Sequence, residues 1–147
     1  MYTHILVPTD GSDLSLKAAR AAAALASKLG ARMTAIHVIE PFRPRIYSEG
    51  AVAYQAYYSR EQYEEGMRKV ADRATGKVAA AAGGVPCDQV CATDSDPWEA
   101  IVEAARAQKC DLIVMASHGR KGLAKLLLGS ETQKVLTHAK IPVLVCR

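Results

Sequence analysis

Short apolar runs alternate along the chain with longer segments in which apolar residues recur at helical spacing. A short apolar run bounded by turn residues is typical of a strand buried on both faces. Apolar residues at every third or fourth position indicate a helix that packs on one face. The pattern predicts strands at 4–8, 33–39, 86–92, 111–116 and 141–146, and helices at 13–29, 59–82, 97–108 and 130–139.

Turn and cap residues mark where these helices begin. Ser12 or Asp13 can cap the first helix, because a side-chain oxygen of either residue can accept from an unpaired N–H group. Two further starts have the spacing of a capping box. One pairs Asp96 with Glu99, and the other pairs Ser130 with Gln133.

The strict alternation of strands and helices predicts an α/β fold. Crossover connections of this length favour a five-stranded parallel sheet in the order 3-2-1-4-5, with helices on both faces. The winding reverses between the first and fourth strands, and ligands bind beyond the strand ends at such a switch point. The two loops expected there are 8–13 and 116–130.

Composition narrows the class of protein. At 147 residues the chain is predicted to form one domain, 1–147, that buries its core without a metal or disulfide. The net charge of +4 is spread along the chain, which argues against nucleic acid or a membrane surface as a partner. Without a signal peptide or a long apolar segment, a cytoplasmic location is expected. The cysteines form no C-x-x-C pair and are predicted to be buried, reduced thiols: Cys87, Cys91, Cys110 and Cys146.

The loop after the fourth strand has the residue types of an anion site. Small residues let the backbone approach a ligand closely, and free N–H groups at a helix start attract phosphate. In the opposite loop, Asp10 can accept a hydrogen bond from a ribose hydroxyl, while Val38 and Met115 at strand ends could sandwich an adenine. A structural interpretation stays open, in which the glycines serve turns and the Ser130 hydroxyl is used by its cap. Positive charge would come from Arg120, Lys121 and Lys125.

Residues 41–58 fit neither a helix nor a strand pattern and are rich in tyrosine. One interpretation is a loop or short helix that covers an edge of the sheet. The other is a mobile lid or an interaction surface. The tyrosines concerned are Tyr47, Tyr54, Tyr57 and Tyr58.

These segments together resemble the universal stress protein (UspA-like) family over nearly the whole chain. Residues 4–12 resemble that family's first strand and loop, and 37–40 resemble the end of its second strand. Residues 111–119, 129–130 and 141–145 resemble its C-terminal third. The resemblance implies a Rossmann-like fold of the adenine nucleotide alpha hydrolase-like type.

ATP-binding members of that family carry G-x-x-G, nine residues, then G-S/T. Here Gly119 is the second glycine, 120–128 is the spacer and Gly129-Ser130 closes the motif, while Ala116 replaces the first glycine. The resemblance implies that ATP or another adenine nucleotide binds, with or without Mg²⁺. The implied contacts are Pro8, Thr9, Asp10, Val38, Met115, Ala116, Ser117, His118, Gly119, Gly129, Ser130, Glu131 and Thr132.

Two function hypotheses follow. The first is a nucleotide-binding regulatory or signalling protein of the stress response. The alternative is a homodimeric stress protein that binds no nucleotide and acts through protein contacts. Ala116 and Glu131 favour the alternative, because the first adds a methyl group and the second adds a carboxylate that repels phosphate.

Catalysis and assembly complete the expectations. No nucleophile and base are accompanied by an orienting third group, so a dedicated enzyme is not expected, although slow ATP hydrolysis is compatible with the sequence. His118 is the histidine best placed for proton transfer, and Asp10 could hold Mg²⁺. The strand 141–146 is an apolar edge that invites pairing with another chain. The family resemblance implies homodimers formed there, and no nucleic-acid or membrane partner is expected.

Overall fold

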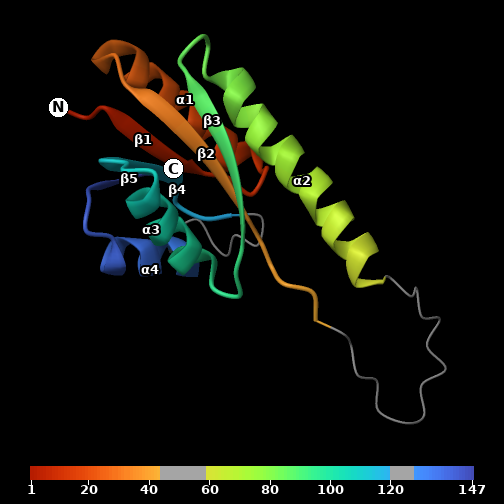
Figure 1. The fold of residues 1–147 in the computed structure, drawn as a ribbon. Coiled ribbons are helices and arrows are strands. Elements are labelled where there is room, and N and C mark those ends of the chain that lie inside the picture. Colours follow the sequence, from red (N-terminus) through yellow and green to blue (C-terminus); the bar gives the residue numbers. More distant parts are fainter. Residues whose placement is uncertain (44–58, 120–127) are drawn as a thin grey trace.

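The computed structural model describes residues 1–43, 59–119 and 128–147. In this part of the chain, strands and helices alternate in the predicted order (Figure 1). The elements are β1 (His4–Pro8), α1 (Asp13–Leu29), β2 (Arg32–Ile39), α2 (Arg60–Ala81), β3 (Cys87–Thr93), α3 (Pro97–Ala107), β4 (Leu112–Ala116), α4 (Ser130–His138) and β5 (Val143–Cys146).

The five strands form one parallel sheet in the order β3-β2-β1-β4-β5, which confirms the predicted topology. β1 lies at the centre and all of its residues are buried. It pairs with β2 on one side, where Val7 is opposite Ala35, and with β4 on the other, where Leu6 is opposite Ile113. The C-terminal ends of β1 and β4 therefore lie side by side.

Alternating side chains of the strands build two separate apolar layers. Ile5 and Val7 pack with α1 and α2, whereas Leu6 between them packs with α3 and α4. Successive side chains on a strand point to opposite faces, so a strand between two helical layers must be apolar throughout. Figure 1 shows α1 and α2 on one side of the sheet and α3 and α4 on the other.

Helix α1 contacts the sheet through methyl groups. Ser12 caps it by accepting from the Ser15 backbone N–H at 3.2 Å, and Gly30 ends it in the left-handed conformation with φ of 66°. Its small inner side chains let the helix backbone lie close to the strands. The buried alanines are Ala18, Ala19, Ala22, Ala23 and Ala26.

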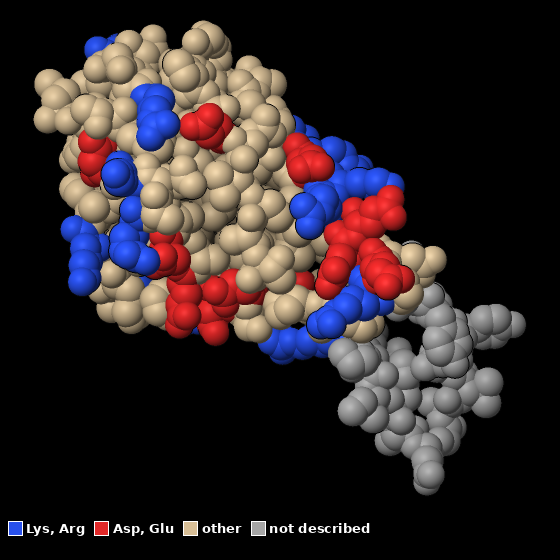
Figure 2. All heavy atoms as spheres, viewed as in Figure 1, with Lys and Arg blue, Asp and Glu red and all other residues tan. Residues whose placement is uncertain are grey.

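Helix α2 has a charged outer surface. Ser59 and Gln62 form a capping box at its start. Figure 2 shows Lys and Arg adjoining Asp and Glu along this helix, as expected from ion pairs one turn apart such as Lys69–Glu65 at 2.8 Å. Each exposed pair of this kind contributes little to stability. Within the described ranges, no helix is long and apolar enough to cross a membrane.

All four cysteines are free thiols, but the prediction that they are buried is wrong for Cys91. Cys91 lies on the edge strand β3 and is exposed. Cys87 and Cys146 are partly buried. Cys110 is buried in the α3–α4 layer, and this burial raises the pKa of its thiol to about 11.

Two sets of residues singled out in the sequence lie outside the described residues. One is the tyrosine set Tyr47, Tyr54, Tyr57 and Tyr58 of segment 41–58. The other is the basic set Arg120, Lys121 and Lys125.

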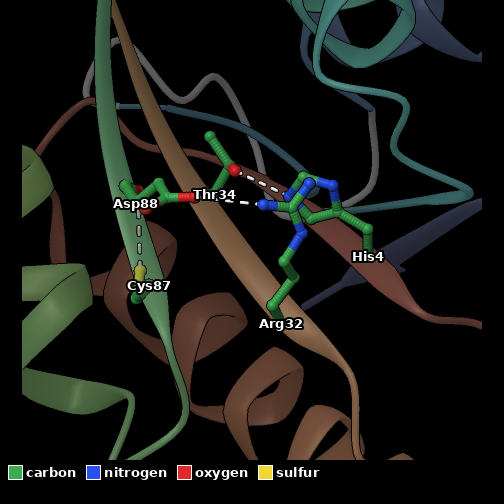
Figure 3. Close-up of polar contacts among 5 residues, drawn as sticks. All are labelled: His4, Arg32, Thr34, Cys87 and Asp88. Atoms are coloured by element: carbon green, nitrogen blue, oxygen red, sulfur yellow. Dashed lines mark hydrogen bonds and ion pairs between the residues drawn. The ribbon is translucent and has the colours of Figure 1, made fainter.

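Polar side chains meet at the N-terminal ends of β1, β2 and β3, at the opposite end of the strands from the loops after β1 and β4 (Figure 3). His4 is only 3% exposed, and its Nε2 shares a hydrogen bond of 2.7 Å with Thr34 Oγ1. Arg32 Nη1 lies 3.5 Å from Asp88 Oδ2 on the neighbouring strand. His4 Nδ1 is buried and makes no hydrogen bond to the described residues.

This environment disfavours a charged imidazole at His4. Burial, followed by the positive charge of Arg32, lowers the pKa of His4 below its ordinary value of 6.5, although the nearby Gln108 backbone and then Asp88 and Asp111 act in the opposite direction. The unfolded chain therefore takes up a proton near pH 6.5 that the folded chain resists. Stability contributed by neutral His4 is present above that pH and is lost as the pH falls below it.

We expect the free energy of unfolding to fall between pH 7 and pH 5, and the His4→Gln substitution to flatten that fall. One proton can contribute a slope of at most about 1.4 kcal/mol per pH unit. Urea unfolding at pH 7, 6 and 5 measures the slope. Equal slopes for the wild type and His4→Gln would refute the prediction.

Candidate functional site

The loop that follows β1 is held by its own hydrogen bonds. Thr9 is buried, and its hydroxyl accepts from the Gly11 N–H at 3.1 Å. Asp10 Oδ1 accepts from the Ser12 N–H at 2.9 Å, and Ser12 in turn caps α1. Gly11 takes a φ of 80°, which favours glycine. The loop is therefore ordered by the chain itself, with the Asp10 carboxylate held at the end of β1.

A histidine from β2 supports this loop. His37 Nδ1 donates to the Thr9 carbonyl oxygen at 2.9 Å. The contact follows from the parallel register, because Pro8 pairs with Ile36 and the next residues of the two strands are neighbours. In the sequence His37 is apparent only as a strand residue, and strand register is the signal that could have identified its role.

The loop after β4 is tied to the start of α4. The Gly129 N–H donates to the Ser117 carbonyl oxygen at 2.7 Å, and Thr132 Oγ1 donates to the Ala116 carbonyl oxygen at 3.0 Å. A Cβ atom on Gly129 would lie 3.1 Å from the His118 Cα, closer than ordinary packing allows. Gly129 therefore favours this close approach, since a larger residue would need His118 to shift by a few tenths of an ångström. Its φ of −60° does not itself need glycine.

The loops after β1 and β4 also meet directly. A Cβ atom built on Gly119 would lie 2.5 Å from Asp10 Oδ2, inside the contact distance of the two atoms. Only a residue without a side chain fits here unless Asp10 moves. The structure thus brings Asp10 and Gly119 together, as the switch-point topology predicts.

No side chain among the described residues caps the N-terminus of α4, so the predicted capping box of Ser130 with Gln133 is wrong. Gly129 occupies the N-cap position, and Ser130 is already the first helical residue. A capping residue needs extended dihedrals, which Gly129 has and a helical residue lacks. The Gln133 side chain instead donates to the Leu128 carbonyl oxygen at 3.2 Å. The Ser130 hydroxyl is exposed and is not used as a cap.

Glu131 directs its carboxylate away from the start of its own helix. Its Oε2 accepts from the Trp98 backbone N–H at 2.9 Å, and its Oε1 lies 3.5 Å from Lys134 Nζ. The predicted capping box of Asp96 with Glu99 at the start of α3 is also wrong. Asp96 is the N-cap of α3, but its side chain makes no capping bond, and Glu131 supplies the acceptor.

Other residues implied by the family resemblance lie deeper in the molecule. Met115 is 6% exposed and packs with the partly buried Val38 in the apolar layer beneath α3 and α4. Ala116 and Ser117 are buried at the end of β4. Ser117 Oγ and His118 Nδ1 share a hydrogen bond of 3.0 Å. Among the residues that the structure describes, no group of three or more His, Cys, Asp or Glu side chains could hold a metal ion.

Comparisons with known proteins agree with this fold. A model described as the universal stress protein family matches residues 1–147. A universal stress protein of Thermus aquaticus is 37% identical over 150 residues, with complete coverage of both chains. The solved structure of MJ0577 from Methanocaldococcus jannaschii gives a TM-score of 0.72 at 27% identity, covering 99% of this chain and 95% of that one. A universal stress protein solved in complex with cAMP gives a TM-score of 0.69 at 25% identity, covering 99% and 97%.

We expect Gly119→Ala to lower the free energy of unfolding by about 1–2 kcal/mol, because the added methyl group forces Asp10 out of its hydrogen-bonded position. In an Asp10→Ala background the same change should cost much less, since the clashing oxygen is gone. Denaturant unfolding of the four proteins in this double-mutant cycle measures the coupling.

Gly66→Ala is the matched control. A Cβ atom at Gly66 on α2 meets nothing within 4 Å, so alanine there should stabilise the protein by about 0.5–1 kcal/mol. A Gly119→Ala protein as stable as Gly66→Ala would show that the two loops do not meet as described.

Proposed function

Because the chain belongs to the universal stress protein family, we propose that it binds an adenine nucleotide where the loops after β1 and β4 meet. The observation that carries the proposal is the uncapped start of α4, held against Ser117 and His118 by Gly129. The complex of a related universal stress protein with cAMP supports the choice of ligand class.

The phosphates bind at the start of α4 in this proposal. An uncapped helix N-terminus presents backbone N–H groups and a partial positive charge, which together attract an anion. The N–H groups of Glu131 and Thr132 and the exposed Ser130 hydroxyl are the proposed donors. Repulsion from Glu131 is reduced, because its carboxylate is bound to Trp98 and Lys134.

The nucleoside binds beside the first loop in this proposal. Asp10 accepts from a ribose hydroxyl through its carboxylate, and the backbone of Pro8, Thr9 and Val38 borders the base. His37 acts indirectly by holding the Thr9 carbonyl oxygen. Adenine recognition by backbone groups fits a strand end, where N–H and carbonyl groups leave the sheet.

Catalysis has a minor place in the proposal. Ser117 and His118 share a hydrogen bond, but no third described side chain is paired with His118 to orient it. Efficient nucleophilic catalysis needs such an orienting group. We therefore propose a regulatory or signalling role in the stress response, with slow ATP hydrolysis at most and with Mg²⁺ entering as part of the nucleotide complex.

Isothermal titration of nucleotide-free protein should show binding of Mg-ATP, AMP or cAMP. Asp10→Asn should weaken it roughly tenfold, because a hydrogen bond to a charged acceptor contributes about 1.5–3 kcal/mol. Asp13→Asn removes the same charge at an exposed position on α1 and should not change the affinity. The proposal fails if no nucleotide gives heat or displaces a fluorescent analogue.

We further propose that β5 joins two copies of the chain. β5 is the last strand of the sheet on its side, and Leu144 is 44% exposed. An apolar edge strand leaves backbone groups and hydrophobic surface unpaired, and a second copy of the strand can cover both. The same edge would serve the alternative function, a stress protein that acts through protein contacts without a nucleotide.

Light scattering at micromolar concentration should report the mass of a dimer, and Leu144→Lys should shift it toward the monomer. Thr93→Lys places the same side chain at an exposed position on the opposite edge strand, β3, and should leave the dimer intact. A monomeric wild type, or equal effects of the two lysines, would contradict an interface at β5.

A further inference from the structure

Helix α3 takes its cap from a different helix. Asp96 is in the N-cap position but makes no side-chain bond, and Pro97 in the first turn has no N–H group. The Trp98 N–H is thus the first α3 donor that needs an acceptor, and Glu131 Oε2 supplies it at 2.9 Å across 33 residues of sequence.

Both oxygens of Glu131 are engaged. Oε2 binds the start of α3, and Oε1 lies 3.5 Å from Lys134 on α4. Two turns further along α4, the His138 ring stacks on the Trp98 indole with 4.2 Å between ring centroids. The start of α3 is therefore attached to both ends of α4, and Figure 1 shows the two helices together on one face of the sheet.

The attached turn of α4 is the turn that carries the proposed phosphate donors. Glu131 contributes its backbone N–H to that set, while its side chain holds the turn to α3. The direction of the N–H groups depends on how this turn is held, because donors fixed in advance lose less entropy on binding. A mobile first turn would bind an anion less well.

We propose that Glu131 is a positioning residue of the nucleotide site and that its bond to Trp98 couples occupancy of the site to the start of α3. This inference rests on the proposed function. The carboxylate stabilises the donor set through α3 and stays out of the phosphate position. Trp98 also borders a surface hollow of about 350 Å³ with Asp94, Glu99, Val102 and Glu103.

The single tryptophan of the chain makes the coupling measurable. Emission from Trp98 should change during titration with Mg-ATP, and calorimetry of the same samples gives the affinity. Glu131→Gln keeps an acceptor for the Trp98 N–H but removes the charge, whereas Glu131→Ala removes both. Comparing Ala with Gln isolates the bond from the charge. We expect Glu131→Ala to bind about fivefold more weakly than Glu131→Gln and to lose most of the emission change.

Lys134→Ala is the control, because it removes the ion pair and leaves the bond to Trp98. Hydrogen exchange of the Trp98 amide tests the attachment without any ligand. That amide should exchange faster in Glu131→Ala than in Glu131→Gln, Lys134→Ala or the wild type. Equal exchange in all four proteins overturns the inference, even if one variant is poorly stable.

The outcomes separate the two proposals. If the wild type binds Mg-ATP but Glu131→Ala matches Glu131→Gln in affinity and emission change, the positioning role is wrong and nucleotide binding stands. If the wild type gives no heat with any adenine nucleotide, the proposed function is wrong and the positioning role falls with it.

Discussion

Parallel pairing of β1 with β4 sets Ile5 beside Leu112 and Leu6 beside Ile113, so the two strands end at one edge of the sheet. The loops that follow them have little room, and a side chain at position 119 would collide with Asp10. The same crowding brings Ser117 and His118 against Gly129, and with it the start of α4. Glycines at these two points are consequences of strand pairing, since neither has the positive φ that would require glycine by itself.

Element order and sheet topology could be predicted because apolar periodicity and turn residues act over a few positions of sequence. The caps of α3 and α4 could not. Both segments have the local spacing of a capping box, but the Trp98 N–H finds its acceptor 33 residues away and Ser130 lies one position inside its helix. The contact of His37 with Thr9 likewise depends on strand register. Local rules fail where a tertiary partner competes with a sequence neighbour, and such partners are concentrated around the candidate site.

The N-terminal and C-terminal ends of the parallel strands differ in how the nearby polar groups are hydrogen-bonded. At the N-terminal ends, the Asp111 carboxylate accepts from the backbone N–H groups of Thr3 and His4, and the His4 side chain hydrogen-bonds to Thr34. At the C-terminal ends of the strands, no side chain among the described residues caps the first turn of α4. A five-residue strand separates the two ends by about 13 Å, and substitutions that far apart usually act independently. Residues at the C-terminal ends can thus change to suit a ligand while those at the N-terminal ends maintain stability.

The alanine face of α1 has a consequence for how this protein can diverge. The helix starts at the Ser12 cap, directly after the loop that carries Asp10, and its inner side chains are methyl groups. A larger residue at Ala22, in the middle of that face, would push the helix away from the sheet and move the attached loop with it. Substitutions on the outer side of α1 therefore leave the position of the loop unchanged, whereas larger residues on the inner side would move it.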